Sequence, residues 1–250
     1  MDKITSRKNP IISHIRKLYA DREYRYLCGE FVCEGKTMLE EAFSSSAEIS
    51  AVVFREGSGR PVSGTSLEYE VPDDLFSFVS PLKNSPGPVF TVKMPKFDEE
   101  AKIHSAIVLE NIQDPGNIGT VLRTAGAFGV GSVVLTGSCA DIYNFKAVRA
   151  SMGAVFRQRT DMVDLADLNR FAEDHSLTLY AAVLSDDAED IRNINCSSCA
   201  FVIGNEGNGV SRELLSICKN KVIIPMSPAS ESLNAAVAAG ILMWEVRKRE

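Results

Sequence analysis

The sequence predicts an α/β protein whose larger part is a mostly parallel sheet with helices on both faces. Short apolar segments recur from residue 105 onwards, and each is followed by a helical or turn-forming segment. Such alternation is typical of parallel strands that are buried between helices. A smaller alternation of helices and strands precedes it. At 250 residues and 45% hydrophobic content, the chain can build the cores of one large or two small domains.

The first 95 residues are expected to form a small α/β domain. Apolar residues at helical spacing predict a helix over residues 10–27, and an apolar segment ending at a glycine predicts a strand over 30–35. The same patterns predict, in order, a helix over 37–43, a strand over 49–54, a helix over 72–79 and a strand over 88–92. Residues 96–102 are assigned to a linker.

Residues 103–250 are expected to form the larger domain. The last predicted helix covers roughly 232–249 and is apolar around much of its circumference, so it must be buried against two partners. These partners are either two parts of the same domain or this domain and a second copy of the chain. The predicted strands cover residues 106–109, 132–136, 177–183, 200–203 and 221–224.

Composition and charge exclude several classes of protein. No apolar run approaches the roughly 18 residues of a membrane helix, and the N-terminus lacks the apolar core of a secretory signal. A cytoplasmic protein without a membrane partner is therefore expected. The net charge of −6 argues against indiscriminate nucleic-acid binding. Residues 1–25 nevertheless hold seven Lys and Arg against three Asp and Glu, which indicates either a solvated helix face or a nucleic-acid contact.

The six cysteines are scattered along the chain, which fits reduced thiols better than a disulfide framework. Cys196 and Cys199 have the spacing of a metal-binding pair. A zinc site needs two more ligands, and no histidine lies close to this pair in the sequence. No bound metal is therefore expected.

Three polar blocks near predicted strand ends carry the candidate functional residues. In the first block, Asn111–Ala125, a turn follows a strand, and Asn117 is expected to cap the helix that carries Arg123. Helix N-termini at the carboxyl edge of a parallel sheet bind phosphates and other ligands. The alternative is that Asn117 only caps and that Arg123 forms a surface ion pair.

The second block, Phe201–Ser211, contains a glycine-rich turn at the end of a strand. Its glycines lack the G-x-G-x-x-G spacing of a dinucleotide site, as do those of Gly126–Gly131, which are expected to end a helix. The turn instead lets the backbone approach a ligand closely, because glycine has no Cβ. Glu206 within it is either a functional acid or a cap for the helix that begins near Val210.

The third block, Glu231–Gly240, begins the last helix. Ser232 and Asn234 stand two residues apart at the helix start. They can therefore both address one pocket, or they can serve as simple N-caps.

Together the three blocks resemble the signature blocks of the SpoU-TrmH RNA 2′-O-methyltransferases, in the same order over roughly residues 105–245. The resemblance implies S-adenosylmethionine-dependent methylation of a ribose in structured RNA, with ribosomal RNA favoured over transfer RNA. It also implies a trefoil knot in the C-terminal third and a homodimer through the last helix. The first domain resembles an L30e-like substrate-binding domain, on the residues Asn9–Ile12, Gly29–Phe31 and Glu34–Lys36.

The resemblance also implies a role for each candidate site residue. Glu206 is expected to orient Arg123 through a charge-assisted hydrogen bond. The catalytic group is Arg123, Asn117, Glu206, Ser232 and Asn234. The residues expected to contact the cofactor are Thr136, Gly137, Gly204, Ile224, Met226 and Leu233. Those expected to contact RNA are Lys3, Arg7, Lys8, Arg16, Arg22, Arg25 and Arg149, with a structural ion pair as the alternative for Arg149.

A guanidinium with a pKa above about 12 is a poor base. Arg123 is therefore expected to clamp the phosphate beside the target ribose and to stabilise developing alkoxide, while the proton passes to phosphate or water. Two other functions compete with methyl transfer. One is a catalytically silent RNA-binding factor for ribosome assembly, and the other is a nicotinamide-dependent dehydrogenase, whose glycine fingerprint is missing.

Overall fold

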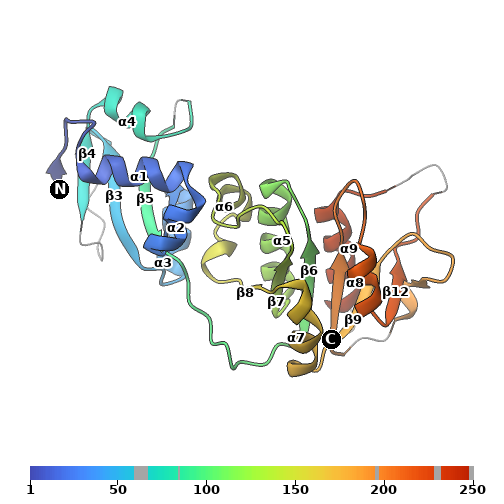
Figure 1. The fold of residues 1–250 in the computed structure, drawn as a ribbon. Coiled ribbons are helices and arrows are strands. Elements are labelled where there is room, and N and C mark those ends of the chain that lie inside the picture. The colour runs from blue at the N-terminus through green and yellow to red at the C-terminus, as the bar shows by residue number, and fades with distance from the viewer. Residues whose placement is uncertain (59–66, 84, 195–196, 228–231, 248–250) are drawn as a thin grey trace. The chain divides into compact units, whose positions relative to one another are not determined.

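The computed structural model describes residues 1–58, 67–83, 85–194, 197–227 and 232–247, and the chain forms two compact units (Figure 1). Unit 1 comprises Met1–Lys96 together with Asp141–Arg157, and unit 2 comprises Phe97–Ala140 together with Gln158–Glu250. The chain therefore passes from one unit to the other three times, after Lys96, Ala140 and Arg157.

Unit 1 is built on a five-stranded mixed sheet in the order β1-β4-β3-β5-β2. β5 runs antiparallel to both of its neighbours, whereas β1, β4 and β3 run parallel to one another. The strands are β1 (Asp2–Lys3), β2 (Glu30–Glu34), β3 (Ile49–Arg55), β4 (Glu68–Val71) and β5 (Val89–Lys93).

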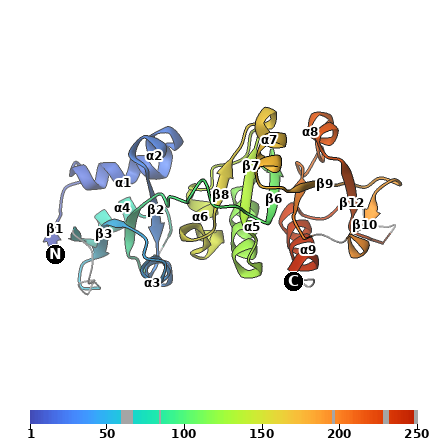
Figure 2. The same ribbon diagram turned by 90° about the horizontal axis from the view of Figure 1, so that it is seen from below.

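Helices cover both sides of this sheet, and Figure 2 shows α1 and α3 on opposite sides. The apolar residues of α1 and α4 share one core with Val32, Val53 and Val89 of the sheet. The helices are α1 (Pro10–Ala20), α2 (Arg22–Cys28), α3 (Lys36–Ser44) and α4 (Asp73–Val79).

Two details of unit 1 differ from the sequence prediction. The helix expected over 10–27 is two helices, because Asp21 takes an extended conformation and its carboxylate caps α2 by accepting from the Tyr24 amide at 3.1 Å. Asp competes well for such local N–H groups, which makes it a poor residue for a helix interior. β4 was not expected, although its four residues alternate between glutamate and an apolar residue in the pattern of a half-buried strand.

Asp141–Arg157 completes the core of unit 1, although it lies far from the rest of this unit in the sequence. It forms α6 (Phe145–Ser151) and a 3₁₀ helix, η1 (Ala154–Phe156), and α6 packs along β2. The centroid of the Phe31 ring lies 4.8 Å from that of Tyr143 and 6.0 Å from that of Phe156. A fragment limited to the first 96 residues would therefore expose Phe31.

A buried ion pair joins this segment to α2. Arg25 Nη2 lies 2.6 Å from Asp141 Oδ2, and the two side chains are 4% and 5% exposed. Arg25 Nε donates to the same oxygen at 2.8 Å. Removing one partner of such a pair leaves an uncompensated buried charge. The Arg25 guanidinium is thus buried in the core of unit 1 and is not available to RNA, contrary to the sequence prediction.

Unit 2 contains a seven-stranded sheet in the order β10-β12-β9-β11-β6-β7-β8, and every pairing in it is parallel. The five strands expected from the sequence are present with ends shifted by at most one residue. The short edge strands β8 and β10 were not predicted. The strands are β6 (Ser105–Glu110), β7 (Ser132–Thr136), β8 (Thr160–Met162), β9 (Thr178–Ala182), β10 (Glu189–Asp190), β11 (Cys199–Ile203) and β12 (Asn220–Ile223).

Helices cover both faces of this sheet, which confirms the predicted fold class. Figure 2 shows α5 and α9 on one face and α7 and α8 on the other. The threading of the C-terminal third as a trefoil knot stays a prediction. The helices are α5 (Pro115–Phe128), α7 (Leu168–Asp174), α8 (Arg212–Ile217) and α9 (Ala235–Arg247), with 3₁₀ helices η2 (Leu165–Asp167) and η3 (Ile191–Asn193).

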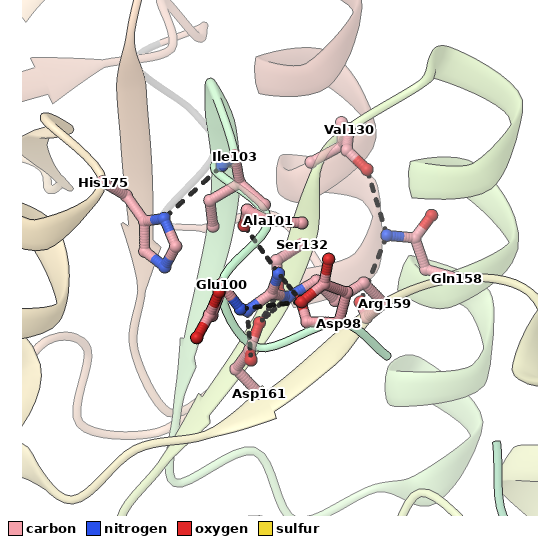
Figure 3. A network of polar contacts seen from close by, with 10 residues as sticks. All are labelled: Asp98, Glu100, Ala101, Ile103, Val130, Ser132, Gln158, Arg159, Asp161 and His175. Atoms are coloured by element: carbon pink, nitrogen blue, oxygen red, sulfur yellow. Dashed lines mark hydrogen bonds and ion pairs between the residues drawn. The ribbon is translucent and has the colours of Figure 1, made fainter. Parts of the chain in front are cut away.

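One arginine anchors the segment through which the chain enters unit 2. Arg159 Nη1 donates to the carbonyl oxygens of Asp98 and Ala101, both at 2.9 Å (Figure 3). Its Nε and Nη2 atoms donate to the two carboxylate oxygens of Asp161 at 2.9 and 3.1 Å. Asp161 also accepts from the Ser132 hydroxyl at 2.6 Å. The predicted linker, residues 96–102, is therefore tied to the sheet by its backbone at Asp98 and Ala101.

Within the part of the chain that the structure describes, no helix is long and apolar enough to cross a membrane. The same residues contain no group of three or more His, Cys, Asp or Glu side chains arranged to hold a metal ion. Cys196 of the cysteine pair lies outside the described residues.

We predict that Phe156→Ala lowers the free energy of unfolding of unit 1 by about 3–5 kcal/mol, because it removes a buried ring next to Phe31. Leu27→Ala is the control: this side chain is 84% exposed, and its loss should cost less than about 0.5 kcal/mol. Urea denaturation of the full chain measures both. Equal, small effects would mean that Asp141–Arg157 does not belong to this core.

Candidate active site

A cavity lies at the carboxyl edge of the unit 2 sheet, where β12, β9 and β11 end side by side. Its volume of about 670 Å³ is in the range of cofactor and small-molecule sites. The carboxyl edge is where open α/β sheets bind ligands. The lining consists of Ala182–Ser185 after β9, Ile203–Val210 after β11, Ile224 and Met226 after β12, and Ser232, Leu233, Ala235 and Ala238 at the start of α9, with Leu215, Lys221 and Val222.

Residues from two of the predicted groups meet in this cavity. The cofactor group contributes an apolar wall and one glycine, and the catalytic group contributes one acid and one hydroxyl. These residues are Gly204, Ile224, Met226 and Leu233 from the first group, and Glu206 and Ser232 from the second.

The glycine turn after β11 has no room for a side chain at its first position. A Cβ on Gly204 would lie 2.1 Å from the carbonyl carbon and oxygen of Gly209 and 2.2 Å from the amide nitrogen of Val210. The turn is closed by the Gly209 amide, which donates to the Asn205 carbonyl at 2.8 Å. The sequence places glycine here because two stretches of backbone touch at the cavity wall.

Two hydrogen bonds join the end of β6 to the chain after β11. The carboxylate of Glu110, which is 3% exposed, accepts from the Ser211 amide at 2.8 Å. Asn205 Nδ2 donates to the Asn111 carbonyl at 2.9 Å. The sequence analysis missed both contacts, since Glu110 and Asn205 have polar side chains whose partners lie about a hundred residues away.

Asn117 connects the three polar blocks. Its Nδ2 donates to Glu206 Oε1 at 2.8 Å, and its Oδ1 accepts from Asn234 Nδ2 at 3.1 Å. One amide in the first turn of α5 thus bridges the glycine turn after β11 and the start of α9. We call Asn117, Glu206 and Asn234 the polar cluster.

The helix caps differ in part from those expected. Asp114, and not Asn117, caps α5, because its carboxylate accepts from the Gly116 amide at 2.8 Å and Pro115 takes the first helical position. Asn117 is therefore free to use its side chain in the polar cluster. Asn234 does cap α9, accepting from the Ala236 and Val237 amides at 2.9 and 3.2 Å, and it also donates to the cluster.

Arg123 lies apart from the polar cluster. Six residues along an α-helix correspond to a rotation of about 240°, so Asn117 and Arg123 face different directions. Arg123 is exposed, and its side chain has no hydrogen bond or ion pair with a residue that the structure describes. The predicted bond from Glu206 to Arg123 is absent from the described contacts, and Glu206 is bound by Asn117 instead.

Thr136 and Gly137 do not line the cavity. Thr136 ends β7 and Gly137 follows it, and β7 is separated from β11 by β6. Thr136 is buried and its Oγ1 has no hydrogen-bond partner in the described structure. Gly137 has a φ of +66°, and a Cβ there would lie 2.4 Å from Asn111 Oδ1. Both residues therefore shape the turn beside Asn111 and do not reach the cavity.

The sequence analysis missed the wall formed after β9. Leu184, which is 59% exposed, and Ser185 line the cavity there. Lys221 of β12 also lines it and donates to Asp187 Oδ2 at 2.7 Å, and this bond lowers the pKa of the Asp187 carboxyl. For Leu184 and Ser185 the signal available in the sequence was position alone, since they directly follow a predicted strand of a parallel sheet. Lys221 lies within a predicted strand and gave no such signal.

All of the residues predicted to bind RNA belong to unit 1. This unit carries 16 Lys and Arg against 14 Asp and Glu, a net charge of +2, whereas unit 2 carries 11 against 19, a net charge of −8. Lys3 is paired with Glu56 at 3.0 Å, which raises the pKa of the lysine. Five of the predicted residues are exposed cations with free N–H groups: Arg7, Lys8, Arg16, Arg22 and Arg149.

The sequence is similar to those of known RNA-modifying enzymes. Residues 104–244 match the model of the SpoU rRNA Methylase family. The chain is 30% identical over 249 residues to the 23S rRNA (guanosine(2553)-2′-O)-methyltransferase RlmP of Bacillus subtilis, with 99% of this chain and 100% of that protein covered.

Solved structures share the whole fold. An AdoMet-bound rRNA methyltransferase from Sinorhizobium meliloti has a TM-score of 0.86 and 26% identity, covering 99% of this chain and 97% of that chain. A structure of an RNA 2′-O ribose methyltransferase has a TM-score of 0.82 and 27% identity, covering 99% and 98%. The fold and the site define an RNA methyltransferase that uses S-adenosylmethionine. The chain belongs to the SpoU rRNA Methylase family.

The cavity has the groups that S-adenosylmethionine requires. Ile203, Ile224 and Leu233 offer an apolar slot for a flat adenine ring. The backbone of the glycine turn supplies N–H and C=O groups at close range, since no Cβ intervenes at Gly204. Glu206 provides a carboxylate that favours a positively charged ligand.

We predict that Gly204→Ala weakens S-adenosylmethionine binding by at least about tenfold, because the new Cβ would force the backbone of the glycine turn out of the cavity wall. Gly207→Ala is the matched control in the same turn. Its Cβ would meet only Asn205 Oδ1, at an ordinary 3.4 Å, so affinity should stay within about twofold. Titration calorimetry measures both, and similar affinities for the two variants would contradict this geometry.

Proposed function

We propose that this protein methylates the 2′-hydroxyl of a ribose in ribosomal RNA. The observation that carries the proposal is the polar cluster, in which Asn117 joins all three blocks beside a cavity suited to the cofactor. Ribosomal RNA is favoured over transfer RNA because the Bacillus relative, similar over its whole length, is named for a ribose in 23S rRNA.

When bound, S-adenosylmethionine supplies an electrophilic methyl group on a positively charged sulfur. The protein contributes by holding a ribose hydroxyl in line with that methyl group. Positioning alone can supply much of a rate enhancement. The polar cluster offers two amides and one carboxylate whose directions are set by the hydrogen bonds among them. Ser232 adds a hydroxyl in the same cavity. We assign orientation of the ribose to these groups.

Arg123 has a different role in this proposal. Its exposed guanidinium is free to bind the phosphate next to the target ribose and to stabilise negative charge on the 2′-oxygen. A guanidinium does not take up a proton at neutral pH. The hydroxyl proton therefore passes to a phosphate oxygen or to water.

The C-terminal helix supports association of two copies. Within one chain α9 packs against α5 and β11, and Leu242 and Ala239 are fully buried there. Val237 and Trp244 on the same helix remain 51% and 52% exposed. Val237 and Trp244 stand seven residues apart on one side of α9, and the centroid of the Trp244 ring lies 5.8 Å from that of Phe128 on the neighbouring α5. This exposed apolar surface suits a second copy of the chain. Because Arg123 does not face the polar cluster of its own chain, activity is proposed to require the dimer.

RNA recognition is assigned to unit 1, which consists of the predicted L30e-like domain, residues 1–95, together with Lys96 and Asp141–Arg157. Its net positive charge contrasts with the net charge of −6 of the whole chain. Phosphate contacts by Lys and Arg dominate the affinity of most RNA-binding surfaces. Unit 1 is thus proposed to hold the RNA, while the cavity of unit 2 holds the cofactor.

We predict that Arg123→Ala lowers methyl transfer to ribosomal RNA by at least about a thousandfold and leaves the affinity for S-adenosylmethionine within about twofold, since the arginine is assigned to the RNA phosphate. Arg212→Ala, an exposed arginine on α8, is the control and should keep full activity. Transfer is followed with radiolabelled cofactor on ribosomal and transfer RNA separately. Transfer only to transfer RNA would refute the substrate, and loss of cofactor binding would refute the role of Arg123.

We predict that Val237→Asp converts the dimer to a monomer and lowers activity in parallel, because the charge would be buried without a partner in the interface. Ala239 is unsuitable for this test, since it is fully buried within its own chain. Leu27→Asp places the same charge on an exposed apolar residue of unit 1 and should change neither property. Sedimentation and activity are measured together. A fully active monomer would contradict the dimer proposal.

A further inference from the structure

Three arginines of unit 1 lie over phenylalanine rings. The guanidinium carbons of Arg7 and Arg16 lie 4.7 and 4.6 Å from the centroid of Phe78, and that of Arg149 lies 5.7 Å from the centroid of Phe145. Such cation–π contacts orient a guanidinium without neutralising its charge. The rings are half-buried, whereas all three arginines are exposed.

The two ring contacts are linked through α1. Tyr19 stands three residues after Arg16 and therefore lies on the same side of the helix. Its ring meets that of Phe145 edge-on, with the centroids 5.1 Å apart. Phe145 and Arg149 are four residues apart on α6, so they are also neighbours. The contacts thus run continuously from α4 across α1 to α6, all within unit 1.

The positive charges of these three arginines are largely available to bind an anion. Arg7 has only an exposed ion pair with Asp74 at 3.9 Å, which is worth little in water. Arg16 donates one N–H to the Phe78 carbonyl at 3.1 Å. No carboxylate of the described residues pairs with Arg16 or Arg149. Three other arginines of the unit are instead bound by acids: Arg25 by Asp141, Arg55 by Asp73 and Arg157 by Glu41.

A guanidinium that lies over a ring and has at most a weak, exposed ion pair is suited to one kind of ligand. The ring fixes the plane of the guanidinium, and the N–H groups at its edge then point outward in the fork geometry that matches two phosphate oxygens. A row of such groups fits a chain of phosphates better than a single anion. Lysine ammonium groups could not be fixed in this way, because they are point charges on flexible stems.

We propose that Arg7, Arg16 and Arg149, held by Phe78 and Phe145 with Tyr19 between them, form a track that binds the phosphate backbone of the RNA substrate. This inference rests on the proposed function for the choice of RNA as the polyanion. An anionic membrane surface offers similar phosphates. RNA is favoured because the chain belongs to an RNA-modifying family and carries a net charge of −6, which disfavours adsorption to an anionic surface.

The test measures the affinity of the full-length protein for a fluorescein-labelled transcript of ribosomal RNA at several salt concentrations. Arg16→Ala and Arg149→Ala should each weaken binding roughly fivefold to tenfold at low salt, and should each reduce the slope of log affinity against log salt concentration by about one. Arg157→Ala removes the same charge from the same segment, but this arginine is paired with Glu41 and its variant should bind like the wild type.

Two further measurements distinguish binding by the track from non-specific attraction between positive charge and a polyanion. Arg16→Lys keeps the charge and loses the planar fork, so it should recover only part of the lost affinity. Vesicles containing phosphatidylglycerol should not displace the RNA. Equal weakening by Arg157→Ala, full recovery by Arg16→Lys, unchanged binding by the alanine variants, or preferential vesicle binding would each overturn the track.

Methyl transfer at saturating RNA, measured on the same variants, separates failure of the track from failure of the proposed function. Wild-type transfer combined with unchanged RNA affinity in the Arg16→Ala and Arg149→Ala variants would refute the track and leave the methyltransferase intact. Reduced RNA affinity in both variants, combined with no transfer by the wild type, would support the track and refute the proposed function.

Discussion

The site depends on the side-chain amide of Asn117 and on the hydrogen bonds that tie the end of β6 to the chain after β11. A parallel sheet brings its strand ends to one edge, but it does not by itself fix the loops that follow them. Here the buried carboxylate of Glu110 holds Ser211, and Asn117 holds Glu206 and Asn234. The cavity wall and the start of α9 are therefore both positioned by the short stretch of chain from the end of β6 to the first turn of α5. Without these hydrogen bonds, the polar side chains of the three blocks would not be held next to one another.

The second constraint is the division of charge between the units. Unit 2 has a net charge of −8 and contains the cavity that we propose for the cationic cofactor, and unit 1 has a net charge of +2 and contains the arginines that lie over phenylalanine rings. A uniformly basic chain would bind any polyanion strongly and would select poorly among RNAs. Asp141–Arg157 also connects these functions covalently, since it leaves unit 2 after the turn at Gly137, completes unit 1 and returns at Gln158.

Local pattern was sufficient for five of the seven strands of unit 2, because buried parallel strands are continuous apolar runs between turn-forming residues. It did not show the short edge strands β8 and β10. It was also sufficient for the three blocks, whose glycines, amides and acids stand at strand ends. It failed where a partner is distant in sequence. Arg25 looks like a surface cation until Asp141 is seen beside it, and Asn117 looks like a cap until Asp114 takes that role. Asp141–Arg157 has ordinary amphipathic composition, so nothing local assigns it to unit 1.

We propose that this chain methylates a ribose of ribosomal RNA and that Arg123 is essential for the reaction. Mass-spectrometric mapping of 2′-O-methylated nucleotides tests it most directly, in RNA from cells that lack this protein and from the same cells supplied with the wild type or with Arg123→Ala. We expect a 2′-O-methyl group in ribosomal RNA to be missing in the deletion, to return with the wild type and to stay missing with the variant. An unchanged methylation map of ribosomal RNA, or full restoration by Arg123→Ala, would contradict it.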